Sequence, residues 1–231
     1  EESAAYWVCA YANNQHELGG DIDPDPRKTS FYKALVYAVG VLLVLDPNGT
    51  PFTRAWCCFE EAMVVRDADR QGAPLLLDVA TVVAGEAHVA TQGTTAADRA
   101  KFDAVDERVR KNPWMAGSFR GLMTGSETSV TRIKMKREAG FPYEVLAKGH
   151  CVDIFLSDAS MAIDKTRILN SIRFGPGVAP ARLNEDVPAE GDPAFAAVNV
   201  ALGGMFAEVS LRAAALEGKF ESAMQVFAKD K

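Results

Sequence analysis

The chain has 231 residues, of which 48% are hydrophobic and 24% charged, and its net charge is −6. These proportions are typical of a folded globular protein and exclude collagen-like, low-complexity and intrinsically disordered classes. The acidic balance argues against a nucleic-acid binder, and the absence of any apolar run of about 20 residues argues against a transmembrane segment.

The beginning of the chain predicts a strand, a helix and a second strand. The apolar run 6–11 predicts a buried strand, which a loop rich in glycine and proline follows. The Thr-Ser pair at 29–30 then caps a helix that extends to about Val39. The uniformly apolar run 41–45 is typical of a parallel strand covered on both faces, and it ends at a turn over 46–49.

The middle of the chain continues this alternation. Thr53 is a suitable cap for a helix that extends to about Asp69, and the apolar run 74–79 predicts another buried strand. A charged helix is predicted over 95–110. We expect 115–139 to be irregular, because glycines interrupt it repeatedly.

The last part of the chain predicts one more strand and helix, followed by an appendage. The strand covers 152–156 and the helix 164–172. Alternating helices and apolar strands predict an α/β domain over 1–173, with a parallel sheet flanked by helices. A linker rich in proline over 174–193 then leads to a helical appendage over 194–231.

The cysteines and the distribution of charge suggest little chemistry. The four cysteines include no C-x-x-C spacing, and the three histidines have no partner at ligand spacing, so no metal site is predicted. Buried thiols favour a reducing compartment, and hence an intracellular, cytoplasmic protein. Residues 99–138 contain ten basic and five acidic residues, which form either a solvated helical face with a loop or a docking patch for an acidic partner.

The helix over 54–64 holds the most informative pattern. On a helical wheel, Trp56 and four other apolar residues form one arc; the other four are Cys57, Phe59, Met63 and Val64. Glu60 falls near the centre of this arc, whereas Glu61 lies beyond its edge. A carboxyl group on a buried stripe either pairs with an arginine or backbone donors, or performs acid, base or ribose-binding chemistry with a raised pKa.

Several of these segments together resemble a known family. They are Trp7-Val8 with Asn13-Asn14-Gln15, the strand 41–46, the helix start 53–61, and the segments 152–154 and 158–169. They are similar to the TIR-like (Toll/interleukin-1 receptor) domains of large eukaryotic microbial proteins, and the Trp-Cys-x-x-Glu core of the helix is the most specific part. The first strand and helix of such a domain would precede residue 6, so we expect the domain to be N-terminally incomplete.

The resemblance implies a flavodoxin-like fold and two alternative functions. In enzymatic members, NAD is the substrate and is cleaved at the nicotinamide–ribose bond; Glu60 matches the catalytic glutamate, and Trp56, Asn14 and Phe52 correspond to positions beside the dinucleotide. No further cofactor is implied. Other members act only as self-association or adaptor modules. The first hypothesis is therefore a protein–protein assembly domain of a larger protein, and the alternative is an NAD hydrolase that uses Glu60.

Overall fold

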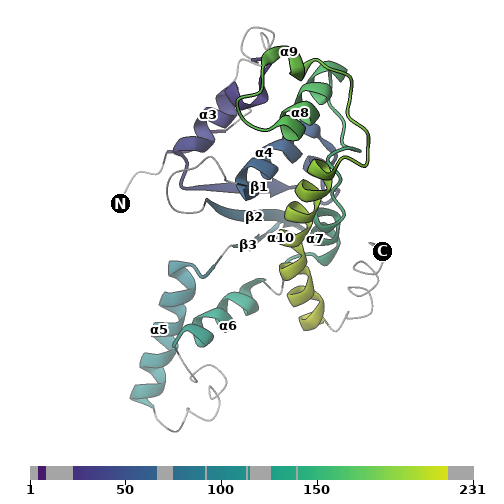
Figure 1. The fold of residues 1–231 in the computed structure, drawn as a ribbon. Helices are drawn as coiled ribbons and strands as arrows, with labels where there is room; N and C mark the ends of the chain where they lie inside the picture. The colour runs from purple at the N-terminus through teal and green to yellow at the C-terminus, as the bar shows by residue number, and fades with distance from the viewer. Residues whose placement is uncertain are drawn as a thin grey trace. The chain divides into compact units, whose positions relative to one another are not determined.

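The computed structural model describes residues 5–8, 23–66, 75–91, 93–112, 114, 126–138 and 140–217. Its elements in chain order are η1 (Pro26–Lys28), α3 (Ser30–Tyr37), β1 (Gly40–Leu45), η2 (Thr50–Thr53), α4 (Ala55–Arg66), β2 (Leu76–Val83), β3 (Glu86–Ala90), α5 (Ala96–Lys111), α6 (Ser126–Glu138), α7 (Tyr143–His150), α8 (Ala162–Phe174), α9 (Pro180–Leu183) and α10 (Pro193–Glu217) (Figure 1).

The chain divides into two compact units that interleave in sequence. Unit 1 comprises Glu1–Val41, Gly49–Leu76 and Lys148–Met205, and unit 2 comprises Leu42–Asn48, Leu77–Ala147 and Phe206–Lys231. The predicted division at residue 173 differs from this one, because segments from both halves of the chain contribute to each unit.

The described strands form one mixed sheet in the order β1-β2-β3. β2 and β3 are an antiparallel hairpin, in register from Val79 opposite Ala90 to Val83 opposite Glu86. Ala84 and Gly85 connect them with positive φ angles of 52° and 82°, the backbone that two-residue hairpin turns require. The coarse α/β class is therefore confirmed, although the sequence analysis did not predict β3.

The strand β1 confirms the predicted element but not its predicted environment. Leu42 and Val44 are 57% and 63% exposed, whereas Leu45 is buried. The expectation that both faces are covered was wrong. When the residues on both faces of a strand are apolar, the sequence does not alternate between apolar and polar residues. The pattern alone therefore could not distinguish a strand covered on both faces from a strand covered on one face.

The predicted strand over 152–156 was also wrong, because this segment forms turns. The Asp153 carboxylate accepts hydrogen bonds from the Phe155 N–H at 2.9 Å and from the Asn199 side chain at 3.0 Å. The Ser157 hydroxyl donates to the Ile154 carbonyl at 2.6 Å. These side chains satisfy local backbone groups that a strand would have paired with a neighbour. Of the strand predicted over 6–11, residues 6–8 have no regular structure and the rest lie outside the described residues.

The predicted helix starts agree with the observed caps at two places. The Thr29 side chain accepts a hydrogen bond from the Tyr32 N–H and caps α3. Thr95 caps α5, with Asp98 completing a capping box. Thr53, by contrast, is the last residue of η2 rather than a helix cap.

The segment expected to be irregular was predicted wrongly in its second half. Residues 126–138 form the helix α6, and α7 follows it at 143–150. Glycines end at residue 125, and the rest of the segment contains none before residue 140. The prediction of irregular structure over 115–139 therefore relied on glycines that lie only in the first half of the segment.

The C-terminal part of the described chain is helical. The segment expected to be a linker carries the short helix α9, whose Leu183 is fully buried. In α10, Phe195, Val198 and Leu202 are buried, and the helix is continuous through Gly203-Gly204. Within the described residues, no helix combines the length and the apolar character needed to cross a membrane.

Candidate functional site

The start of α4 is fixed by tight contacts within unit 1. Gly49 has φ 65°, and a Cβ atom there would lie 3.1 Å from the side chains of both Lys148 and Phe52, so glycine suits this position. The Ala55 N–H donates to the Asp158 carbonyl and the Asp158 N–H donates to the Thr53 carbonyl, each at 2.8 Å. These bonds form an isolated parallel bridge that anchors the first turn of α4.

The burial of α4 differs from the predicted wheel. Its most buried face is built on Ala55, Cys58, Phe59 and Ala62, whereas Glu60 is only half-buried. Three of these four residues are small, which allows other elements to approach the helix closely. The predicted buried arc was defined by the large apolar side chains of the helix and took no account of these small residues. The prediction that Glu60 lies at the centre of the buried face was therefore wrong.

Trp56 and Glu60 lie one turn apart on the same side of α4, as predicted, but this is the less covered side of the helix rather than its buried face. The Trp56 indole N–H lies 3.5 Å from the Asp164 carboxylate on α8, at the outer limit of a hydrogen bond. The Trp56 ring meets Phe59 edge to face, with centroids 6.3 Å apart. Asp164 is a neighbour that the sequence analysis did not connect with Trp56, since the two are 108 residues apart.

Desolvation dominates the electrostatics of Glu60. Burial of its carboxyl group raises the pKa to about 7, although the positive charge of Arg54 opposes this shift. A carboxyl group with this pKa is partly ionised at neutral pH. It is therefore able to act as a proton acceptor or as a carboxylate that stabilises positive charge.

Glu61 is more deeply buried than Glu60. Its side chain is 3% exposed, and neither carboxyl oxygen has a hydrogen-bond partner among the described residues. Burial, together with the negative charge of Glu60, raises the pKa of Glu61 to about 8. Glu61 was not among the predicted site residues, because it lies beyond the edge of the apolar arc on a helical wheel.

The neighbouring cysteines Cys57 and Cys58 occupy different environments. Cys58 is fully buried and its thiol donates to the Phe52 carbonyl at 3.2 Å, whereas Cys57 is half-buried. Burial and the nearby Glu61 raise the pKa of Cys58 strongly, so this thiol is protonated and unreactive at neutral pH.

Two further residues were predicted for this site, Phe52 and Asn14, and the structure describes only Phe52. Phe52 is buried in η2, ahead of α4, and its carbonyl rather than its ring makes the described polar contact. Asn14 lies outside the described residues. Among the residues that the structure describes, no three cysteine, histidine, aspartate or glutamate side chains are placed to hold a metal ion.

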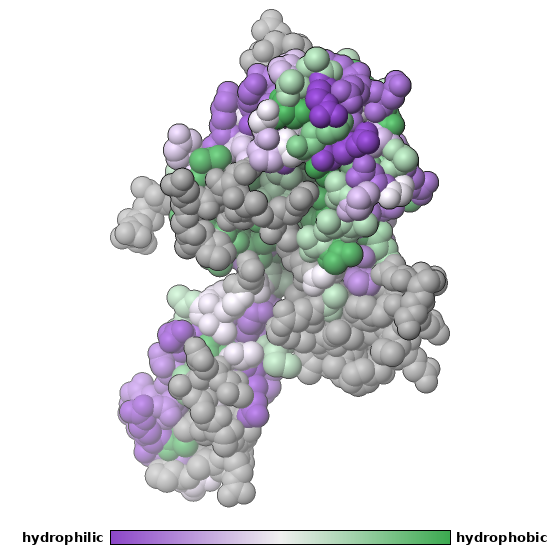
Figure 2. All heavy atoms as spheres, viewed as in Figure 1, coloured by the Kyte–Doolittle hydropathy of each residue, from purple (hydrophilic) through white to green (hydrophobic). Residues whose placement is uncertain are grey.

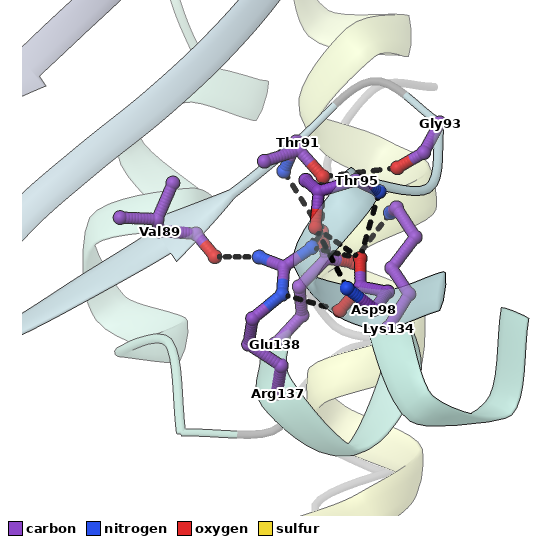
Figure 3. Close-up of polar contacts among 8 residues, drawn as sticks. All are labelled: Val89, Thr91, Gly93, Thr95, Asp98, Lys134, Arg137 and Glu138. Atoms are coloured by element: carbon purple, nitrogen blue, oxygen red, sulfur yellow. Dashed lines mark hydrogen bonds and ion pairs between the residues drawn. The ribbon is translucent and has the colours of Figure 1, made fainter. Parts of the chain in front are cut away.

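A second cluster of buried charge lies in unit 2, where the end of β3 meets α5 and α6 (Figure 3). Asp98, Lys134 and Glu138 are all at least 96% buried. The Arg137 guanidinium donates two hydrogen bonds of 2.9 Å to the two oxygens of Asp98. Glu138 accepts from Lys134 at 2.6 Å and from the Thr91 N–H at 2.8 Å.

This cluster, which we call the α5–α6 network, is electrically balanced. It pairs two acidic with two basic side chains, and Arg137 also donates to the Val89 carbonyl at 2.9 Å. The hydrogen bond from Arg137 lowers the pKa of Asp98 to about 2. Two of the basic residues in the window 99–138, Lys134 and Arg137, therefore form ion pairs within unit 2. Hydrophilic residues dominate the surface over α5 (Figure 2).

Comparisons with known proteins add no relative: no family model, curated protein or solved structure matches this chain.

Proposed function

We propose that this chain is a protein–protein assembly domain of the TIR-like kind. The observation that carries the proposal is the exposure of apolar side chains on the sheet: Leu42, Val44 and Val82 are 57%, 63% and 56% exposed. Single exposed apolar residues are ordinary, but several on neighbouring strands are typical of an interaction surface. β1 also contains neither a charge nor a proline, the features that commonly protect a strand from association.

Self-association is the form of assembly that is tested most directly. Light scattering over a range of concentrations should show a species larger than the 24.9 kDa monomer. Leu42→Lys and Val44→Lys should reduce it to the monomer, because a buried ammonium group opposes association. Val200→Lys is the matched control, since Val200 is an exposed valine on α10 rather than on the sheet. A species that is monomeric at every concentration and retains no partner would contradict the proposal.

A second candidate function is hydrolysis of NAD at the nicotinamide–ribose bond. The observation that favours it is the pairing of a half-buried carboxyl group, Glu60, with an aromatic ring, Trp56, on the same side of α4. The pKa of about 7 leaves a carboxylate available at neutral pH. Such a group stabilises the oxocarbenium-like charge that develops on a ribose as its leaving group departs.

The proposed reaction requires little from the protein beyond these two groups. The bond between ribose C1′ and the nicotinamide nitrogen breaks, and nicotinamide leaves with the bonding electrons. The Glu60 carboxylate stabilises the resulting positive charge, and water adds to C1′ and releases a proton. The Trp56 ring offers an apolar surface against which a nucleotide ring can stack.

The test of this candidate is nicotinamide release from NAD. Activity should rise with pH around a midpoint of about 7, as Glu60 becomes ionised. Glu60→Gln should abolish it, whereas Glu190→Gln, at an exposed glutamate outside the helices, should leave it unchanged. Equal activity in all three proteins would exclude Glu60 as the catalytic residue.

A further inference from the structure

Glu61 is the one buried carboxyl group on α4 that neither proposed function uses. Its side chain is 3% exposed, and both of its oxygens lack a hydrogen-bond partner among the described residues. An ionised carboxylate in such a place loses its hydration without compensation, which is among the most unfavourable arrangements in a protein interior. A protonated carboxyl group avoids most of this penalty.

The described surroundings of Glu61 offer no compensating positive charge. Among the described elements, η2, α8 and α3 make the most extensive contacts with α4. The charged side chains on these elements and at their ends are Arg54 after η2, Asp164, Lys165, Arg167 and Arg173 on α8, and Lys33 on α3. Within the described part of the chain, none of them pairs with Glu61. Arg54 acts on Glu60 instead, and Lys165 lies 4.0 Å from Asp158.

The charged group that acts on Glu61 is its neighbour, Glu60. Two carboxylates in adjacent positions repel each other, so ionisation of one opposes ionisation of the other. Glu60 is half-buried and has the positive charge of Arg54 to favour its ionised form, whereas Glu61 is almost fully buried and has no hydrogen-bonded cation among the described residues. The geometry thus distinguishes the two groups: the negative charge belongs on Glu60 and the proton on Glu61.

We propose that Glu60 and Glu61 form a carboxyl pair that carries no more than one negative charge at neutral pH, with Glu61 as the positioning residue that holds the proton and thereby keeps the charge on Glu60. The consequence for the site rests on the second proposed function, NAD cleavage by Glu60. In that reaction, Glu61 sets the upper pH limit of activity, because ionisation of its carboxyl group adds a second, unsolvated negative charge to α4. The pKa values of about 7 and about 8 agree with this order of ionisation.

The pair is tested first without reference to any activity. The carboxyl carbons of Glu60 and Glu61 are followed by NMR as the pH of the whole chain is raised. Glu60 should ionise before Glu61, and in Glu60→Gln the midpoint of Glu61 should fall by on the order of one pH unit, because the repulsion is gone. Glu61 ionising below pH 6 like an exposed glutamate, or keeping its midpoint in Glu60→Gln, would overturn the proposal.

The second test measures nicotinamide release as a function of pH. The wild type should lose activity above about pH 8. Glu61→Gln, which keeps the shape of the side chain but cannot ionise, should remove this alkaline loss while leaving the rise near pH 7 in place. If Glu61→Gln does not fold, Glu61→Met fills the buried site without a charge and answers the same question. An alkaline loss that persists in the folded variant would count against the assignment of Glu61.

The two tests separate the inference from the function on which it rests. Coupled ionisation without nicotinamide release supports the carboxyl pair and contradicts NAD cleavage. Nicotinamide release with independent ionisation of the two groups supports NAD cleavage and contradicts the carboxyl pair.

Discussion

The two clusters of buried charge in this protein are built on opposite principles. In the α5–α6 network of unit 2, each of the four charged side chains has a partner of opposite sign, and the pKa of Asp98 is lowered to about 2. On α4 in unit 1, the carboxyl groups of Glu60 and Glu61 are adjacent and of the same sign, and both pKa values are raised.

This difference indicates which cluster serves the fold and which is a candidate for chemistry. A balanced and fully hydrogen-bonded network holds helices in place and has no unused capacity for a ligand. A buried carboxyl group without partners does nothing for stability, so its presence invites a functional explanation. The pH response of each cluster follows from the same contrast, since acid should weaken the first and alkali the second.

The largest expected effect comes from breaking the α5–α6 network. Arg137→Ala leaves Asp98 buried without its cation and the Val89 carbonyl without a donor. The loss should be about 3–5 kcal/mol in the free energy of unfolding, measured by urea denaturation. Lys136→Ala is the control, because Lys136 is an exposed basic residue on the same helix and should change stability by less than about 0.5 kcal/mol. A loss of under about 1 kcal/mol for Arg137→Ala would show that the network is dispensable.

The next effect concerns Glu61. Its pKa rises from 4.5 in the unfolded chain to about 8 in the folded protein. At a pH between these two values, Glu61 is therefore protonated in the folded state and ionised in the unfolded state. Stability is therefore fully present below pH 4.5 and falls as the pH rises toward 8. Glu61→Gln should be similar to the wild type at pH 5 and more stable at pH 8, by up to about 4 kcal/mol. Parallel stability curves for the two proteins would contradict the buried, protonated state of Glu61.

The smallest of the three effects is the acid response of Asp98. Its pKa falls from 3.8 to about 2 on folding, so its contribution is present above pH 3.8 and is lost as the pH falls toward 2. The shift corresponds to about 2 kcal/mol. Comparison of wild type and Asp98→Asn by thermal unfolding at pH 2 and pH 6 should show a difference at pH 6 that largely disappears at pH 2. A difference of equal size at both values would mean that Asp98 acts through packing rather than charge.

The parts of the fold that the sequence predicted depend on short-range physics. Thr29 and Thr95 mark helix starts because their side chains satisfy the first free N–H groups of α3 and α5. The apolar runs at β1 and β2 mark strands for similarly local reasons. The turns over 152–156 were missed, because Asp153 is bound by Asn199, which lies 46 residues further along the chain.

The candidate site was predictable only in part, for a related reason. The spacing of Trp56 and Glu60 places both on one side of a helix in any structure, and this was confirmed. Which side of that helix is covered depends on the elements that pack against it, and small residues such as Ala55 and Ala62 decide it here. The unpartnered state of Glu61 depends on the positions of every neighbouring donor, which no spacing along the chain encodes.

The parallel bridge at the start of α4 has a consequence for the order of folding. It pairs Arg54 with Asp158, so it closes a loop of roughly a hundred residues, and such a loop is entropically slow to close. The turns of α4 can form from local contacts within microseconds, but its first turn is anchored only when the distant segment arrives. The surroundings of Trp56 should therefore be among the last to become native, and its fluorescence should report a late kinetic phase of refolding.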